Sequence, residues 1–200
     1  MTKQQPYRVV QSYDAFELRE YPAHLVAEVI TDGPFDGAGN RAFRYLFAYI
    51  SGQNQVGRKV AMTAPVVQAD AGGPSAKIAM TAPVVQQAVD EPGDWAAPAS
   101  GEKFRVAFVL PEGMTADTAP QPTDPRVTLR TVPDSVSAVI RYSGTWSQAG
   151  YQRHLAQLRT ALRAAGLTVV GPPRYARFDP PLTPWFLRRN EILLDVEPAR

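Results

Sequence analysis

The chain has 200 residues, of which 44% are hydrophobic and 20% are charged, as in an ordinary globular protein. The formal net charge is +2 and the Lys and Arg residues are scattered, so neither nucleic acid nor an anionic membrane is expected as a partner. Because cysteine is absent, disulfides, thiolate nucleophiles, Cys-ligated zinc, iron–sulfur clusters and covalent c-type haem attachment are excluded. The N-terminus MTKQQPYRVV lacks the apolar core of a signal peptide, and no apolar run is long enough to span a bilayer. We expect a cytoplasmic protein and a monomer.

The first elements in chain order are two strands and a helix. Residues 17–35 predict a strand, a Pro-containing turn, a second strand and then a glycine. A helix is predicted over about residues 37–50, with apolar side chains at i, i+3, i+4 and i+7 on one face: Phe43, Leu46, Phe47 and Ile50. This stripe is the expected buried face. Tyr45 and Tyr49 lie off it, so the helix is aromatic over more than that face.

A ten-residue segment then occurs twice. Residues 59–68 read KVAMTAPVVQ and residues 77–86 read KIAMTAPVVQ, with the small-residue stretch ADAGGPSA between them. Two β-rich segments joined by such a loop predict a hairpin, or two copies of one edge element. The prolines, Pro65 and Pro83, predict that the strand ladder is interrupted in each copy.

The C-terminal part of the chain repeats the N-terminal pattern. Residues 128–146 align without gaps with residues 17–35, and the two stretches coincide at Leu, Arg, Pro, Ala and Gly. A second helix is predicted over about residues 147–165, with Ser147 as its N-cap and Gly166 just past its end. Its apolar stripe contains Tyr151, Leu155, Leu158 and Leu162.

Each half continues from its helix into a proline-containing β segment and a closing strand, over residues 104–110 and 191–196. Neither half could bury its sheet face and its helix alone, so we expect the halves to pack into one domain over residues 1–200. We therefore predict an α+β fold, a pseudo-two-fold distorted β-barrel with two main helices. Its two β-β-α-β-β halves are expected at about residues 7–112 and 125–197.

Residues with catalytic chemistry are few. No nucleophile elbow, Walker loop or His-Glu-x-x-His motif occurs in the sequence. Carboxylates on strands, such as Glu28, form no convincing acid–base pair. We therefore expect a protein that is not an enzyme, and a small hydrolase using Glu28 is the least favoured alternative.

Large apolar side chains exceed the needs of a core in two places. On the first helix, Phe43 and Phe47 can belong either to the core or to a binding surface. The loop over residues 180–189, PPLTPWFLRR, holds Trp185 and Phe186 next to arginines. Aromatic side chains on a Pro-rich loop beside arginines suit a flat apolar ligand that carries carboxylate tails.

Several motifs in a fixed order resemble the SOUL/haem-binding protein family. They are the AMTAPV segments, FRVAFVLP, QPTDPRVTLRTVP, AVIRYSGTWS and DPPLTPWFLRRNEILLDV, and the likeness covers about residues 7–197. The tandem AMTAPV form is seen among the bacterial members of the family. The resemblance implies a distorted barrel of duplicated β-rich halves with two helices. It also implies reversible, non-covalent binding of haem b or a related tetrapyrrole.

By position, the family's ligand groove would involve Asn40, Phe47 and Ala48 on the first helix and Thr183 in the Pro-rich loop. Phe47 keeps the apolar contact, whereas the other three positions, often cationic in the family, are neutral here. Arg41, Arg44 or Arg188 can supply the missing positive charge. With the aromatic side chains, the candidate site comprises Asn40, Arg41, Phe43, Arg44, Phe47, Ala48, Thr183, Trp185, Phe186 and Arg188.

Two alternatives stay open. His24 on a strand and His154 on the second helix are possible axial iron ligands, although a surface or boundary position is favoured for both. The same barrel architecture resembles bacterial effector-binding domains, so a sensor for another small hydrophobic ligand is the second function hypothesis.

Overall fold

The computed structural model describes residues 3–55, 77–88, 103–179 and 182–197. The first copy of the repeated segment, with Pro65, and the prolines at 180 and 181 lie outside the described residues. The elements of the described chain are β1 (Lys3–Gln4), β2 (Arg8–Ser12), β3 (Glu17–Tyr21), β4 (His24–Asp32), α1 (Phe35–Ile50), β5 (Asn54–Gln55), β6 (Thr81–Ala82), β7 (Val84–Ala88), β8 (Lys103–Val109), β9 (Gln121–Pro122), β10 (Thr128–Val132), β11 (Ser135–Tyr142), α2 (Gln148–Ala164), β12 (Arg174–Arg177), a 3-10 helix η1 (Trp185–Leu187) and β13 (Asn190–Asp195).

Nine of these strands form one curled sheet in the order β10-β4-β8-β7-β12-β13-β11-β3-β2. The first strand of each predicted half pairs with the second strand of the other half, β3 with β11 and β10 with β4. The registers also match: Glu17 lies opposite Val139 and Thr128 lies opposite Glu28, and the sequence repeat aligns Glu17 with Thr128. β7 and β12 pair at the centre. The predicted α+β, pseudo-two-fold distorted barrel is confirmed.

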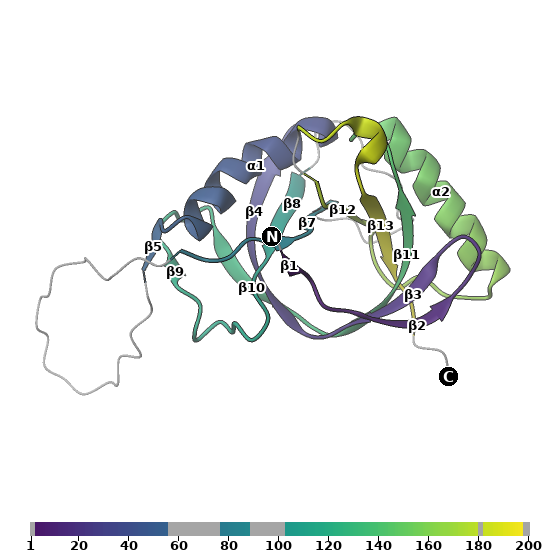
Figure 1. Cartoon of the computed structure of the whole chain (residues 1–200), viewed down its shortest axis with the longest axis horizontal. Helices are drawn as coiled ribbons and strands as arrows, with labels where there is room; N and C mark the ends of the chain where they lie inside the picture. Colours follow the sequence, from purple (N-terminus) through teal and green to yellow (C-terminus); the bar gives the residue numbers. More distant parts are fainter. Residues whose placement is uncertain (1–2, 56–76, 89–102, 180–181, 198–200) are drawn as a thin grey trace, which may run out of the picture.

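Both helices lie on the outer, convex side of the curled sheet (Figure 1). α1 contacts β4 and β8, whereas α2 contacts β11 and β13, so the helices occupy equivalent places in the two halves. Between helices and sheet, the ring of Phe35 makes edge contacts with Tyr151 at 4.9 Å and with Tyr175 at 5.1 Å. These aromatic contacts join the two halves because Phe35 begins α1 and Tyr151 lies on α2.

The buried face of α1 differs from the predicted one. Phe43 is 40% exposed and Phe47 is 47% exposed, so of the two places left open for them, core or surface, they lie at the surface, whereas Tyr49, off the predicted stripe, is only 1% exposed. The Tyr49 hydroxyl donates to the Pro120 carbonyl at 2.8 Å, and burial raises the pKa of Tyr49 to about 12. The physical reason is that Ala38 and other small residues let the helix approach the sheet closely. A prediction made from the large apolar residues alone overlooks this packing face. The buried residues are Phe35, Ala38, Gly39, Ala42, Leu46, Tyr49 and Ile50.

The second helix follows the prediction. Ser147 is the N-cap, and its hydroxyl oxygen accepts a hydrogen bond from the backbone N–H of Gly150 at 3.2 Å. Gly166 has φ +69° just past the end, where a glycine avoids the strain of a side chain. The predicted stripe is the buried face: Tyr151, Leu155, Leu158 and Leu162. No helix in the described part of the chain is long and apolar enough to cross a membrane.

The second copy of the repeated segment is divided at its proline, as predicted. β6 ends at Ala82, β7 begins at Val84, and Pro83 lies between them. β6 pairs with β1, whereas β7 joins the large sheet. The proline therefore marks the point where the chain leaves one pairing and enters another, which places β6 beside α1 at the edge of the groove described next.

Candidate functional site

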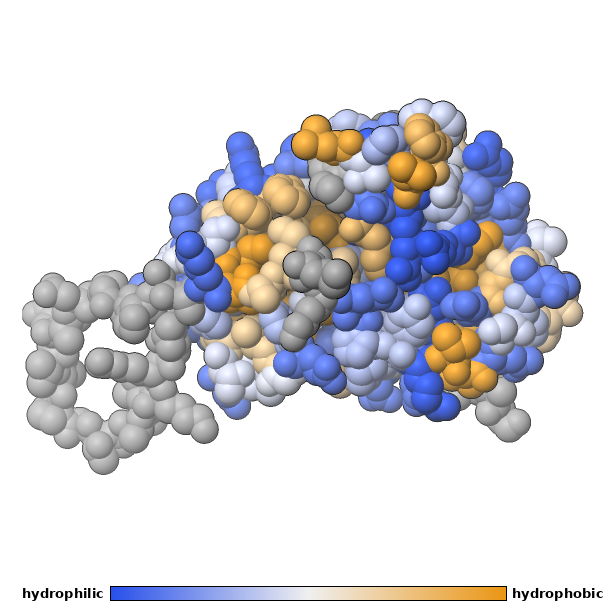
Figure 2. Space-filling model, viewed as in Figure 1, coloured by the Kyte–Doolittle hydropathy of each residue, from blue (hydrophilic) through white to orange (hydrophobic). Residues whose placement is uncertain are grey.

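An apolar groove opens between α1 and the end of β12. We call it the α1 groove; its volume of about 510 Å³ lies within the range of small-molecule sites, about 300–1,000 Å³. α1 supplies Asn40 and Phe43, the segment before β6 supplies Met80, and the chain after β12 supplies Phe178 and Asp179. Figure 2 shows apolar surface over the region of α1 and a hollow beside it. The groove therefore suits an apolar ligand.

Two phenylalanines make one wall of this region unusually apolar. The rings of Phe43 and Phe47 stack in parallel, with centroids 5.6 Å apart and an angle of 12° between their planes. Phe43 also contacts Phe108 of β8 edge-on at 5.5 Å, so the sheet supports the pair from beneath. Exposed aromatic surface of this kind marks binding sites, because leaving it in water is unfavourable.

Trp146 and Arg177 line the polar end of the groove, and Arg188 lies against Trp146. The guanidinium of Arg177 lies 5.0 Å from the centre of the Trp146 ring, and that of Arg188 lies 4.4 Å from it. The indole N–H donates to Oδ1 of Asn190 at 2.9 Å, which holds the ring in place. Two cations around a fixed aromatic face provide positive charge where a ligand carboxylate could pair.

Buried partners hold Arg177 beneath the groove. Its side chain is only 8% exposed; Nε donates to the Tyr151 hydroxyl at 3.3 Å and Nη2 donates to Oε1 of Gln86 at 3.2 Å. A Cβ atom on Gly39 would lie 2.8 Å from Nη1 of Arg177. A glycine at this point of α1 therefore leaves room for the guanidinium.

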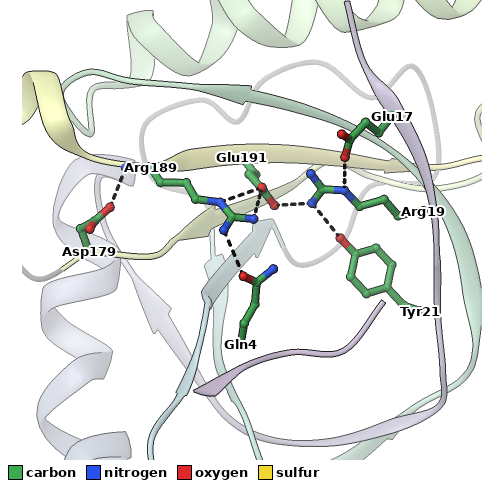
Figure 3. A network of polar contacts seen from close by, with 7 residues as sticks. All are labelled: Gln4, Glu17, Arg19, Tyr21, Asp179, Arg189 and Glu191. Atoms are coloured by element: carbon green, nitrogen blue, oxygen red, sulfur yellow. Dashed lines mark hydrogen bonds and ion pairs between the residues drawn. The ribbon is translucent and has the colours of Figure 1, made fainter. Parts of the chain in front are cut away.

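Asp179 adds a carboxylate to the rim of the groove. Its Oδ2 accepts the backbone N–H of Arg189 at 2.5 Å, and the Arg189 side chain binds Glu191 and Gln4 (Figure 3). Glu191 is 1% exposed and also accepts from Arg19 at 2.9 Å. A continuous polar network thus connects the rim of the groove with the concave side of the sheet.

Neither histidine lines the α1 groove. Nδ1 of His24 donates to the Pro22 carbonyl at 2.9 Å, and Nε2 lies 3.2 Å from the amide nitrogen of Gln5. The ring of His154 stacks on Tyr142 at 4.0 Å. Burial lowers the pKa of both histidines below the usual value, so both are neutral at neutral pH.

The carboxylate of Glu28 is engaged by two arginines. Its Oε1 lies 3.2 Å from Nε of Arg105, and its Oε2 accepts from Nε of Arg130 at 2.8 Å. The Glu28 side chain is only 8% exposed. The carboxylate of Glu28 is therefore held in two ion pairs.

Comparison with known proteins identifies the family of the chain. The sequence model of the family described as SOUL heme-binding protein matches residues 2–76 and 69–195. The chain belongs to the SOUL haem-binding family. Its relatives include Heme-binding protein 1 of Mus musculus, 28% identical over 166 residues, which cover 82% of this chain and 75% of that protein. Heme-binding protein 1 of Xenopus tropicalis is 27% identical over 183 residues, which cover 89% of this chain and 82% of that protein.

Solved structures share the fold of this SOUL-family chain at low sequence identity. The C-terminal domain of EcmrR is 10% identical, with a TM-score of 0.57 and coverage of 96% of this chain and 99% of that one. A hydrolase from Listeria innocua is 14% identical, with a TM-score of 0.57 and coverage of 94% of each chain. At these identities the likeness shows the fold alone.

The site residues expected on the first helix separate into two groups. Asn40 and Phe43 line the α1 groove, and Phe47 stacks on Phe43 beside it. Ala48 lies further along α1 and is half-buried without lining the groove. The helix residues that meet at the groove are therefore one amide and two aromatic rings.

The two arginines of α1 point elsewhere. Arg41 donates from Nε to Oγ1 of Thr31 at 3.2 Å and from Nη2 to the Pro34 carbonyl at 3.1 Å. The guanidinium of Arg44 lies 4.5 Å from the centre of the Tyr45 ring. Neither side chain lines the α1 groove.

The residues of the loop before β13 also lie in different places. Nε of Arg188 donates to the Thr183 carbonyl at 2.7 Å, which directs the guanidinium over Trp146. Trp185 and Phe186 are 58% and 57% exposed, and Trp185 lines a surface depression next to His154 instead of the α1 groove. Of the loop residues singled out from the sequence, Arg188 is the one whose contacts reach the polar end of the groove.

The lining residues that sequence reasoning missed include Met80, Trp146, Arg177, Phe178 and Asp179. One signal for Trp146 was present, because the internal repeat aligns it with Phe35, another aromatic residue at a helix start. The others come from segments far apart in sequence, and no spacing could have brought them together.

Proposed function

We propose that this protein binds haem b non-covalently in the α1 groove and acts as a carrier or buffer of it. The observation that supports this most directly is the exposed, stacked pair of Phe43 and Phe47 beside an apolar groove of about 510 Å³. Membership of a haem-binding family supports the ligand class. With no cysteine in the chain, thioether attachment is excluded, which favours haem b over a covalent form.

The groove is apolar beside the two phenylalanines and polar at the Trp146 end, and this difference suggests how the ligand lies. The porphyrin ring would rest against the two phenylalanines, where apolar contact stabilises it. Arg188, whose guanidinium lies over Trp146, would pair with the propionates through charge-assisted hydrogen bonds. Asp179 lies at the same rim, and its negative charge would repel any further anionic group on the ligand. Bound haem would supply a redox-active iron.

The iron would depend little on histidine, because both histidines lie outside the groove. Met80 lines it, and its thioether sulfur is a group that could bind the iron. Binding would then rest mainly on contacts to the ring, which fits reversible uptake and release by a carrier that performs no turnover.

A haemin titration of the purified protein, followed at the Soret band against a buffer blank, tests the proposal. We expect saturable one-to-one binding near 1 μM or tighter, which corresponds to about 8 kcal/mol or more. Phe47→Glu should weaken binding by about tenfold or more, because it puts a charge against the porphyrin face. Gln152→Glu, on the exposed side of α2, adds the same charge away from the groove and serves as the control.

A response that does not saturate would contradict haem binding itself. Equal affinity of the wild-type protein and Phe47→Glu would leave haem binding intact but overturn the α1 groove as its site. The position of the Soret band reports on axial ligation, so the same titration of Met80→Leu examines the thioether.

A further inference from the structure

A second cavity lies on the concave side of the sheet, away from the helices. We call it the concave cavity, and its volume is about 250 Å³. Val85 and Ala176 line it, whereas their neighbours Val84 and Arg177 line the α1 groove on the other side of the sheet. The segment with β1 runs across the open side of the barrel, and Gln5 of this segment lines the cavity (Figure 1). The sheet therefore lies between the cavity and the proposed haem site, and Phe178, at the end of β12, lines both.

Much of the wall is apolar. Val26 of β4, Val109 of β8 and Leu193 of β13 line the cavity, and each is less than a tenth exposed. Val132 of β10 continues this surface. Because strands of both halves contribute, the wall encloses its contents on several sides and can hold a small apolar body.

One group of charges in the cavity is unbalanced. Arg105 and Arg130 both line the cavity, and both pair with the single carboxylate of Glu28. Two guanidinium groups against one carboxylate leave one positive charge. In the described part of the chain, the terminal amino groups of Arg105 and Arg130 donate to no other residue, so they are available to an acceptor in the cavity.

The charges of the nearest other groups on the concave side of the sheet cancel. Arg174 pairs with Asp195, and both line the cavity. His24 adds no charge, because burial and the positive charges of Arg174 and Arg130 lower its pKa and only the backbone hydrogen bond to Pro22 opposes them. These residues therefore leave the excess charge of Arg105 and Arg130 uncompensated.

The network around Glu191 is also neutral (Figure 3). Arg19 and Arg189 both bind Glu191, and Arg19 also binds Glu17 at 2.8 Å, so two positive charges meet two negative ones. Burial by itself would lower the pKa of Arg19, but Glu191 and Tyr21 raise it overall, so Arg19 stays charged. The charged residues that line the cavity, together with their ion-pair partners, therefore carry a single net positive charge.

We propose that the concave cavity binds a small organic monoanion with an apolar body, such as a carboxylate that carries one aromatic ring. The carboxylate would pair with Arg105 and Arg130, and the valines and Leu193 would hold the ring. Guanidinium groups match a carboxylate well, because they offer two parallel N–H donors. A volume of about 250 Å³ is half that of the α1 groove, so the ligand would be smaller than a porphyrin.

Phenylacetate is a suitable probe, with phenylacetamide and benzylamine as its neutral and cationic counterparts. Two-dimensional NMR of the full chain would follow backbone amides while each compound is added up to about 10 mM. We expect phenylacetate alone to shift amides of β4, β8 and β10 saturably, with a Kd of about 1 mM or below. Benzylamine should not bind, because it would place a second positive charge beside the arginines.

Variants at Arg130 test the charge directly. Arg130→Gln removes the excess charge but leaves Glu28 paired with Arg105, so the fold should persist and the affinity for phenylacetate should fall about tenfold. Arg130→Lys keeps the charge and should stay within a few-fold of wild type. Arg8→Gln removes an exposed arginine that pairs with Glu20 on the edge of the sheet, and should not change the affinity.

The outcomes separate this site from the haem site. Phe47→Ala should bind phenylacetate as the wild-type protein does, whatever it does to haemin. Absence of saturable shifts, equal binding of benzylamine, or unchanged affinity in Arg130→Gln would each overturn the monoanion site. Loss of phenylacetate binding in Phe47→Ala would also overturn it, because the ligand would then lie in the α1 groove.

Discussion

The two helices occupy equivalent places in the two halves but differ on the sides that face away from the sheet. Leu46 of α1 and Leu158 of α2 are both 0% exposed and pack on the sheet in the same manner. On the outward side, α1 carries Phe43 and Phe47, whereas exposed positions of α2 are mostly polar, as at Gln152. The halves thus share their buried faces and differ in what they show to solvent.

This difference shows where the duplicated fold is free to change. The buried faces must both fit the same curled sheet, and close packing resists changes there. The outward faces carry no such constraint, so one half can acquire aromatic surface while the other keeps polar surface. The α1 groove lies on the aromatic half, which supports its assignment as the haem site. A change in one half can therefore be compared with a matched change in the other half.

The largest effect on stability is expected from substitutions in the buried faces that the two helices share. Leu46→Ala and Leu158→Ala should each lower the free energy of unfolding by about 2–5 kcal/mol, because each leaves a cavity in a closely packed core. Urea unfolding followed by circular dichroism measures both. A cost below about 1 kcal/mol in one variant alone would mean that the two helices do not have equivalent structural roles.

The next effect concerns the outward faces. The double variant Phe43→Gln, Phe47→Ala gives α1 an outward face like that of α2, and should weaken haemin binding by about tenfold or more. Its free energy of unfolding should fall by only about 1 kcal/mol per site, because each ring is about half exposed already. Gln152→Phe on α2 is the reciprocal control and should leave haemin affinity unchanged. A large loss of stability in the double variant would make the phenylalanines structural.

Substitutions at the starts of the two helices should differ by a smaller amount in their effect on the free energy of unfolding. Ser147→Ala removes the hydrogen bond from the Gly150 N–H to the serine hydroxyl at the start of α2, and should cost about 1 kcal/mol. α1 begins after Pro34, which offers no side-chain cap, so Pro34→Ala should not lose a cap of this kind. Chemical denaturation of the two variants compares them, and an equal loss in both would show that the Ser147 bond adds nothing.

The smallest effect lies in the pH dependence, since each half contains one histidine. Burial lowers the pKa of His24 in the folded protein below the usual 6.5, so its contribution to stability is complete above pH 6.5 and is lost as the pH falls. His24→Gln should therefore flatten the decline in unfolding free energy between about pH 7 and pH 5. His154 has the same direction of shift, and its hydrogen bond to Gln157 opposes it. His154→Gln should flatten the decline less, and the reverse order would contradict the positions of the two rings.

Much of the fold follows from local sequence patterns. The gapless alignment of residues 17–35 with residues 128–146 predicts the pseudo-two-fold pairing, because equivalent segments take equivalent places in a duplicated sheet. The stripe of α2 and its Ser147 cap were predicted for the same kind of reason, since period and capping act within a few residues. α1 was misread because its packing face is made partly of small residues such as Ala38 and Ala42.

The sequence by itself determined the duplication, the fold class, the second helix, the absence of thiol chemistry and the family resemblance. Only the tertiary structure decided which face of α1 meets water, and it leaves Phe43 and Phe47 partly exposed there. It also decided that Met80 and Trp146 meet at one groove, and that Arg105 and Arg130 share one carboxylate. The physical reason is that burial and charge balance are sums over neighbours in space, and these neighbours come from strands and helices distant along the chain.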